Sequence, residues 1–299
     1  MTDPGPDDAR HTVVVDGVPV AFEERGDGPT VVVIHGWSAD RRYMQADLEP
    51  VFEGRGGWRR VYLDLPGHGA TPAPDWFSTQ DDMLAVVGGF VDQVAGSGPC
   101  AVVGSSYGGY LALMLARTMP QRLRGVAMLV PDVPDAVGGR LTEPQVTLHP
   151  DTTVFDDLAD DESWIPAALV RHERRMLDAI RADDMPAYRV ADYAFLARLE
   201  HSYLPSGAAA VPGPPFGHPS LILCGRQDAT TGFRSAALLV DEFPRATCAV
   251  VDLAGHHLGR IERPEVFHAL VDDWLDRMEL EAPEDRDDPD AQMRRREPS

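Results

Sequence analysis

Two adjacent serines follow a short apolar run in the stretch CAVVGSSYGGYLALMLA, residues 100–116. Only Ser106 lies at the centre of a Gly-x-Ser-x-Gly pattern, because centring it on Ser105 would need glycine where Val103 and Tyr107 stand. Glycine at both flanks permits a strand-to-helix turn that is too tight for a side chain, and this turn presents the serine oxygen at a helix N-terminus. We therefore predict that Ser106 is a nucleophile and that Ser105 is a packed residue of the turn.

A serine hydroxyl is a weak nucleophile unless a base takes its proton and an acid orients that base. Two acids closely follow apolar runs after the serine: Asp132 follows VAMLVP, and Asp228 follows SLILCG. His256 and His257 lie on a loop after the last apolar run, in DLAGHHLGRIERP. Adjacent residues of an extended loop point in opposite directions, so only one can be the base. We choose His256, because Gly255 lets the backbone turn sharply just before it, and we expect His257 to be a pocket or lid contact.

Acyl transfer also needs two preorganised hydrogen-bond donors for the oxyanion that forms. One donor is predicted to be the backbone N–H of Tyr107, the residue after the serine. The other is expected from the loop HGWSAD that follows the apolar run TVVVI, and Trp37 is the candidate there. His35 and His68 lie in turn motifs, and we expect them to brace loops.

Each of these residues comes directly after a run that reads as a buried strand. Such runs alternate with helical patterns near residues 40–53, 79–95, 107–119, 232–242 and 263–278, and a hairpin is expected around Asp16-Gly17. This alternation predicts an α/β fold with a mostly parallel central sheet and helices on both faces. In such a sheet the chemistry collects at the carboxyl ends of the strands, which is where these residues fall.

Residues 132–217 interrupt the alternation, since they show helical patterns in SWIPAALVRHERRMLDAIRA and PAYRVADYAFLARLEH and begin and end in Gly/Pro-rich stretches. We expect a helical cap at 132–217, a core at 11–131 and 218–278, and disordered tails at 1–10 and 279–299. Aromatic and apolar residues of the cap could line a pocket, although a cap also needs its own apolar core, which is the default interpretation for each. They are Trp164, Ile165, Tyr188, Tyr193 and Phe195.

The chain has 299 residues and a formal net charge of −21, and all of its 27 basic residues are arginine. Such a charge disfavours nucleic acid and anionic membranes as partners. Cys100, Cys224 and Cys248 lie in strand-like runs and are expected to be buried free thiols in a reducing compartment. We find no signal-peptide pattern, no apolar run of membrane-spanning length, no cofactor motif and no metal site. A cytoplasmic protein with a small-molecule substrate is expected, and the oligomeric state is left open.

The stretches VVVIHGW, VYLDLPGHGAT, VVGSSYGGYLA, LILCGRQDATTG and AGHHLGRIERPEVF together resemble the α/β-hydrolase superfamily, in its lid-bearing, esterase-like branch. The resemblance implies the α/β-hydrolase fold, and it favours Asp228 over Asp132 as the acid. It implies a serine hydrolase that cleaves a small uncharged ester or related carbonyl compound through an acyl-enzyme. A ligand-binding or signalling protein with a slow triad, or an acyltransferase, is the alternative. The histidine loop departs from the family pattern, because His256 precedes Glu262 by six positions and related loops often have five.

Overall fold

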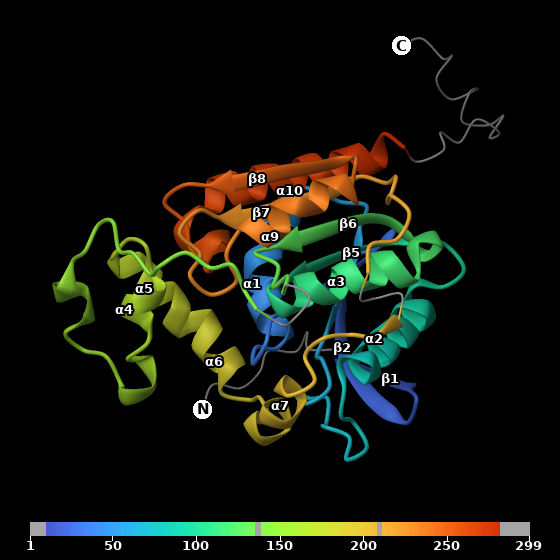
Figure 1. Cartoon of the computed structure of the whole chain (residues 1–299), viewed down its shortest axis with the longest axis horizontal. Helices are drawn as coiled ribbons and strands as arrows, with labels where there is room; N and C mark the ends of the chain where they lie inside the picture. The colour runs from blue at the N-terminus through green and yellow to red at the C-terminus, as the bar shows by residue number, and fades with distance from the viewer. Residues whose placement is uncertain (1–9, 135–138, 208–210, 282–299) are drawn as a thin grey trace, which may run out of the picture.

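The computed structural model describes residues 10–134, 139–207 and 211–281, which form an eight-stranded sheet in the order β1-β2-β4-β3-β5-β6-β7-β8 (Figure 1). β1 pairs antiparallel with β2 and β2 with β4, and the remaining neighbours are parallel. The strands are β1 (Arg10–Val15), β2 (Val18–Arg25), β3 (Thr30–Ile34), β4 (Arg59–Leu63), β5 (Cys100–Ser105), β6 (Leu123–Leu129), β7 (Ser220–Gly225) and β8 (Ala246–Val251). The predicted mostly parallel sheet and the hairpin at Asp16-Gly17 are confirmed.

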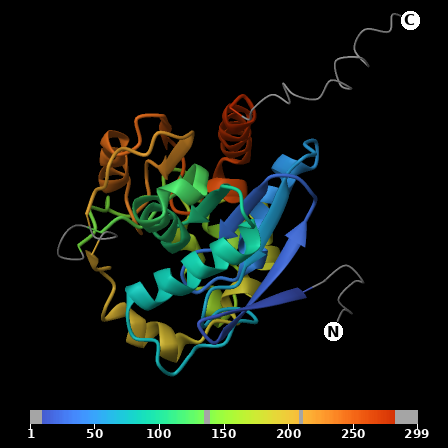
Figure 2. The same cartoon turned by 90° about the vertical axis from the view of Figure 1, so that its right-hand side faces the viewer.

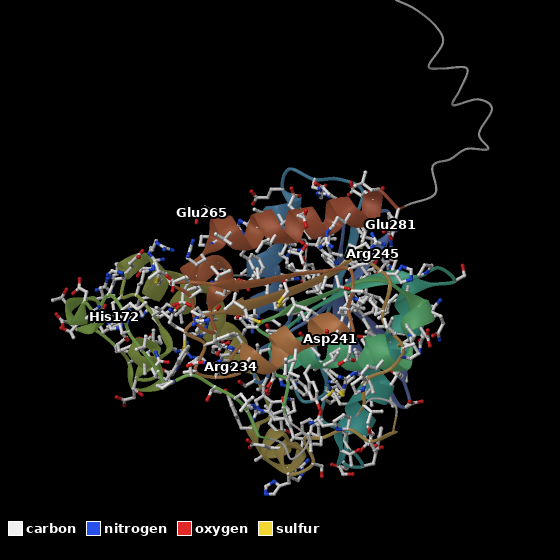
Figure 3. The ribbon with its side chains drawn as sticks, turned by 45° about the horizontal axis from the view of Figure 1, so that its top comes forward. His172, Arg234, Asp241, Arg245, Glu265 and Glu281 are labelled. Atoms are coloured by element: carbon white, nitrogen blue, oxygen red, sulfur yellow. The ribbon has the colours of Figure 1, made fainter. Side chains whose placement is uncertain are left out.

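Helices cover both faces of the sheet, as predicted. α1 (Arg41–Phe52) and α10 (Pro264–Glu279) pack on one face, where Met44 and Trp274 are buried. α2 (Gln80–Ala95), α3 (Tyr107–Thr118) and the short α9 (Arg234–Ala237) pack on the other face. Figure 2 shows α2 and α10 on opposite sides of the sheet. An ion pair between Arg245 and Glu281 ties the start of β8 to the end of α10 (Figure 3).

The boundaries of the expected tails differ slightly from the structure. Arg10 already belongs to β1, and α10 continues one residue beyond position 278. Apart from residue 10 and residues 279–281, both tails lie outside the described residues.

The prediction that all three cysteines are buried is wrong for Cys248. Cys100 and Cys224 are buried, whereas Cys248 is exposed. The reason is topological: β8 is the edge strand of the sheet, and its residues are mostly part-exposed rather than covered on both faces.

The described part of the segment between β6 and β7 consists of short helical pieces (Figure 1). They lie beyond the carboxyl ends of β6 and β7, except for α7, which lies beside the core (Figure 1). The α-helical pieces are α4 (Ile165–Ala168), α5 (Arg174–Ala179), α6 (Met185–Tyr188) and α7 (Tyr193–Glu200), and a π-helical turn over Ile180–Asp184 joins α5 to α6. 3-10 turns of this segment occupy Thr152–Phe155 and Asp160–Glu162, and two others lie outside it, at Pro120–Arg122 and Leu238–Asp241.

The first helical pattern of this segment is not one helix, because the backbone around Val170 forms tertiary hydrogen bonds. The Val170 N–H donates to the Glu262 carboxylate over 2.8 Å, and the Val170 carbonyl accepts from the Leu148 N–H over 2.8 Å. The second helical pattern, which starts at Pro186, is not one helix either. Pro186 lies inside a helical run that is continuous from residue 174 to 188.

Candidate active site

The turn at Ser106 has the strained geometry that its flanking glycines predict. Ser106 lies between β5 and α3 with φ 56° and ψ −116°, a region that side-chain-bearing residues rarely adopt. A Cβ at Gly104 would come within 2.0 Å of the Gly108 carbonyl oxygen, and a Cβ at Gly108 within 2.3 Å of the Ile34 carbonyl oxygen. Neither position therefore accepts a side chain without displacing backbone. The two glycines let the turn close and hold α3 against the end of β3.

Three of the predicted residues meet at the carboxyl end of the sheet in one hydrogen-bonded series. The Ser106 Oγ lies 3.0 Å from the His256 Nε2, and the His256 Nδ1 lies 2.9 Å from the Asp228 Oδ2. Ser106 follows β5, Asp228 follows β7 and His256 follows β8. Because Nδ1 faces a carboxylate, it carries the hydrogen, and Nε2 is left to accept from the serine hydroxyl.

The pKa shifts of this pair agree with such a series. Burial lowers the pKa of His256, but the negative charge and hydrogen bond of Asp228 outweigh it and raise the pKa above the ordinary value of 6.5. Burial likewise raises the pKa of Asp228, and the charge of His256 and the hydrogen bonds to the carboxylate bring it below the ordinary value. The site thus favours a carboxylate beside an imidazole that readily accepts a proton.

Thr231 is a contact of this site that was not predicted from the sequence. Its hydroxyl donates to the Asp228 Oδ2 over 2.8 Å, and its backbone N–H donates to the Oδ1 over 3.0 Å. The Thr230 N–H donates to the same Oδ1 over 2.8 Å. A threonine three residues after an aspartate in a turn is the sequence signal that could have indicated it. These bonds fix the orientation of the carboxylate toward His256.

The extra residue in the histidine loop is accommodated beyond His256. Leu258–Glu262 form a π-helical turn with a non-helical Gly259, at φ −49° and ψ −124°. The buried Glu262 carboxylate accepts from the Gly255 N–H over 2.5 Å and so closes the loop onto itself. This role of Glu262 was not predicted.

The structure places neither alternative residue in the series. The Asp132 carboxylate accepts two hydrogen bonds from the Arg140 guanidinium, over 2.6 and 2.7 Å, and one from the Tyr203 hydroxyl over 2.6 Å. The His257 ring instead stacks on Trp164, with centroids 5.6 Å apart.

The loop that carries Trp37 lies directly against the serine. A Cβ placed on Gly36 would lie 3.3 Å from the Ser106 Cβ and 3.9 Å from its Oγ. The rings of Trp37 and Tyr107 also meet edge to face, with centroids 4.8 Å apart. The first N–H groups of a helix have no intrahelical partner, and Tyr107 is the first residue of α3. Both predicted donors therefore belong to backbone next to Ser106.

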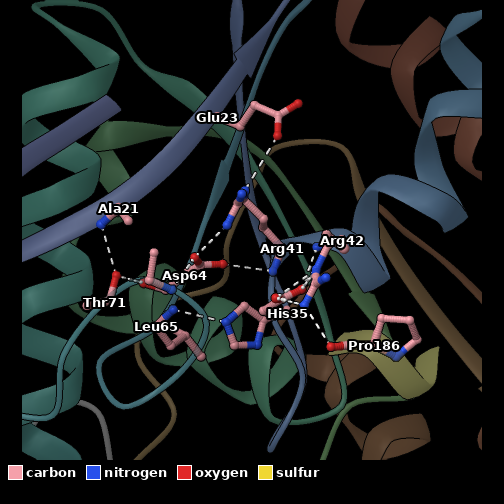
Figure 4. Close-up of polar contacts among 11 residues, drawn as sticks. Ala21, Glu23, His35, Arg41, Arg42, Asp64, Leu65, Thr71 and Pro186 are labelled. Atoms are coloured by element: carbon pink, nitrogen blue, oxygen red, sulfur yellow. Dashed lines mark hydrogen bonds and ion pairs between the residues drawn. The ribbon is translucent and has the colours of Figure 1, made fainter. Parts of the chain in front are cut away.

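Two buried histidines brace this loop, as predicted. His35 Nε2 accepts from the Leu65 N–H over 2.9 Å (Figure 4), and His68 Nε2 accepts from the Ser38 N–H over 3.2 Å. Burial lowers the pKa of His35 to about 4 and that of His68 to about 3, so both rings are neutral near pH 7. Figure 4 also shows the buried Arg41 near His35, and Arg41 donates to Asp64 over 2.7 Å.

A cavity of about 650 Å³ opens above Ser106 and His256, and side chains of the β6–β7 segment form part of its wall. Of the expected pocket residues, Trp164, Tyr188 and Tyr193 line the cavity, whereas Ile165 and Phe195 are fully buried in apolar clusters. A smaller cavity of about 260 Å³ touches Ser106 from the side of Asp132 and Arg140. The wall of the 650 Å³ cavity is mostly aromatic or apolar, which suits an aromatic or apolar ligand.

Within residues 10–134, 139–207 and 211–281, no three or more His, Cys, Asp or Glu side chains are grouped so that they could hold a metal ion. None of the helices described there has the length and hydropathy that a membrane crossing requires.

Residues 29–259 match the family described as alpha/beta hydrolase fold, and the chain belongs to this family. In solved structures it resembles an alpha/beta superfamily hydrolase from Oenococcus oeni PSU-1, with a TM-score of 0.80 and 21% identity over 90% of this chain and 99% of that one. At this identity the likeness shows the fold alone. The predicted fold is thereby confirmed.

Two curated relatives differ in their printed activities. The chain is 30% identical over 265 residues to the 2-succinyl-6-hydroxy-2,4-cyclohexadiene-1-carboxylate synthase of Salmonella paratyphi B, a match that covers 81% of this chain and 92% of the synthase. It is 37% identical over 131 residues to the dihydrolipoyllysine-residue acetyltransferase component of the acetoin cleaving system of Cupriavidus necator. That match covers 43% of this chain and spans only 34% of the relative. The family therefore indicates a hydrolase-like enzyme and does not select one reaction.

Proposed function

We propose that the chain is a serine hydrolase that cleaves a small uncharged ester or related carbonyl compound through an acyl-enzyme. The observation that carries this proposal is the hydrogen-bonded series from Ser106 through His256 to Asp228 at the floor of the 650 Å³ cavity. Two features make such a series competent: the base contacts the nucleophile, and the acid holds the base in the required tautomer.

In this mechanism the Ser106 Oγ attacks the substrate carbonyl while His256 Nε2 takes its proton. Asp228 stabilises the imidazolium that results, and the backbone N–H groups of Trp37 and Tyr107 hold the oxyanion. His256 then returns the proton to the leaving group, and a water molecule activated by the same base releases the acyl group. The strained backbone at Ser106 supports this role, because a turn of this kind presents the serine oxygen at the start of α3.

The charge of the cavity walls supports an uncharged substrate. Arg189 lines the larger cavity and is paired with Asp161 over 2.8 Å, and Arg140 lines the smaller one and is paired with Asp132. Among the described lining residues these arginines have their charge balanced, and a carboxylate-bearing compound would find no free cation. For this reason we do not extend to this chain the carboxylate product named for the Salmonella relative.

We further propose that the β6–β7 segment acts as a cap that selects the substrate, because Trp164, Tyr188 and Tyr193 come from it. The proposal includes a cytoplasmic location, which suits an exposed free thiol at Cys248.

The test combines a panel of p-nitrophenyl esters of increasing acyl length with labelling by a fluorophosphonate probe. We expect Ser106→Ala to abolish labelling and to lower kcat by a factor on the order of 10⁶. Ser105→Ala is the matched control, since it removes the neighbouring hydroxyl from the same turn, and it should retain labelling. Labelling that survives in Ser106→Ala would refute the mechanism. A wild-type chain that binds the esters without releasing product would favour a ligand-binding protein instead.

A further inference from the structure

A second histidine faces the same cavity beside the proposed catalytic base. The His257 ring centroid lies 6.2 Å from that of His256, and the two rings are nearly perpendicular at 84°. His257 is buried, lines the 650 Å³ cavity and stacks on Trp164 of the β6–β7 segment. The mechanism proposed above assigns it no step.

One nitrogen of this ring is directed at a buried carboxylate. His257 Nδ1 lies 3.5 Å from the Oδ2 of Asp184, which is itself fully buried at the end of the π-helical turn. Both atoms are buried, and neither has a hydrogen-bond partner among the described residues. Buried polar atoms are rarely left without partners, so this pair is set up to engage when the ring or the carboxylate moves slightly.

The other ring nitrogen, Nε2, forms no hydrogen bond within the described residues. Unlike Nδ1, it does not count among the buried atoms without a partner. Since His257 lines the cavity, Nε2 is the atom that it offers to a ligand.

The surrounding charges decide which nitrogen carries the hydrogen. The Arg260 guanidinium contacts Asp47 at 3.7 Å, Asp183 at 3.6 Å and also Asp184. Three carboxylates thus share one guanidinium, and this negative excess favours an N–H on the side of Asp184. A neutral imidazole with its hydrogen on Nδ1 presents a lone pair at Nε2, and such a nitrogen accepts hydrogen bonds.

From this geometry we infer that His257, positioned by Asp184, is a specificity residue that selects substrates bearing a hydroxyl close to the scissile carbonyl. This inference rests on the proposed function and names the substrate class of the same site. His257 Nε2 accepts the hydrogen bond from the substrate donor while the carbonyl lies at Ser106. A site that hydrogen-bonds a substrate hydroxyl disfavours an analogue that lacks it, because the polar group of the site is then left unpaired.

The experiment compares three p-nitrophenyl esters of equal chain length: hexanoate, 3-hydroxyhexanoate and 3-methoxyhexanoate. The methoxy ester retains the oxygen but has no hydrogen to donate, so it separates hydrogen bonding from polarity. A second series of 2-hydroxyethyl and 2-methoxyethyl hexanoates places the same groups on the alcohol side. For the wild type we expect kcat/KM for the hydroxyl compound to exceed that of its methoxy partner by roughly 3- to 10-fold in one of the two series.

Three variants test whether His257 and Asp184 cause the preference for the hydroxyl compound. His257→Leu should bring the hydroxyl-to-methoxy ratio of kcat/KM to about 1, and His257→Gln, which keeps an acceptor, should restore part of it. Asp184→Asn removes the negative charge and offers an N–H to Nδ1, so Nε2 becomes a donor and the ratio should also fall toward about 1. Thermal melting of each variant checks that it is folded, and the ratio compares two substrates on the same protein.

A wild-type ratio near 1 in both series, with the esters still hydrolysed, would overturn the inference and leave the proposed function standing. A preference that persists in folded His257→Leu would overturn it as well. Absence of both ester turnover and fluorophosphonate labelling would instead refute the proposed function.

Discussion

Replacement of His68 by glutamine should change how the stability of the protein depends on pH. The ring is fully buried, and burial holds its pKa at about 3. In the unfolded chain the same group titrates near its ordinary value of 6.5. Between these two values the unfolded state carries a proton that the folded state does not. Stability contributed by the neutral ring is therefore complete above pH 6.5 and is lost as the pH falls.

The size of the effect follows from these two pKa values. Between pH 7.5 and pH 5.0 the His68 ring alone lowers the free energy of unfolding by about 2 kcal/mol. This follows from a slope of ~1.4 kcal/mol per pH unit below pH 6.5. His35, with a pKa of about 4, adds a similar loss over the same range. Asp47 acts in the opposite direction, because burial raises its pKa to about 6. Both of these contributions remain in the variant and cancel in the comparison.

The assay is urea unfolding of wild type and His68→Gln at pH 7.5, 6.5, 5.5 and 5.0. Glutamine can still accept from the Ser38 N–H, although the variant is expected to be less stable overall. The informative quantity is the change in unfolding free energy between pH 7.5 and 5.0, which should be about 2 kcal/mol smaller in the variant. Equal changes in the two proteins would refute the reasoning, since they would mean that His68 does not titrate differently on folding.

Three further predictions concern the active site. Asp228→Asn should lower kcat by a factor on the order of 10⁴, because the amide no longer fixes the tautomer of His256; near-normal ester kinetics would contradict this. Thr231→Val removes a hydrogen bond to a charged carboxylate and should lower kcat roughly 10- to 100-fold, to be measured on the same ester, with Thr231→Ser as the control that retains the hydroxyl. Since the pKa of His256 is raised and the base must be neutral, kcat/KM should fall as the pH drops through a midpoint above 6.5; a pH profile with its midpoint below 6.5 would contradict this.

The core could be predicted because its strands, and the candidate catalytic residues that follow them, are marked by local sequence patterns. The apolar runs, the helical patterns and the glycine register around Ser106 are local signals, and local signals were enough to place β5, α3 and the serine. That Asp228 and His256 lie near the serine followed from the carboxyl ends of parallel strands meeting at one edge. The choice of Asp228 over Asp132 also needed the family resemblance, and the choice of His256 over His257 needed the turn at Gly255.

The contacts that could not be predicted are those made between segments distant in sequence. Val170 breaks a helical pattern because its N–H donates to Glu262, which lies 92 positions away. Asp184 and His257 approach each other from the β6–β7 segment and the histidine loop, and no pattern in either stretch indicates the other. Cys248 was placed in a strand correctly, but its exposure depends on β8 being the last strand of the sheet.

The glycines at positions 108 and 225 have a consequence for how such a protein can be re-engineered. A Cβ on Gly225 would lie 2.2 Å from the Gly255 carbonyl oxygen, just as one on Gly108 would meet the Ile34 carbonyl. Close backbone contacts thus set the spacing between the loops of the serine and Trp37, and between the loops of the acid and the base. Spacing that is set by backbone contacts does not depend on the side chains that line the pocket. Variants at Trp164, Tyr188 or Tyr193 can therefore be screened for new substrates while the positions of Ser106, Asp228 and His256 are retained.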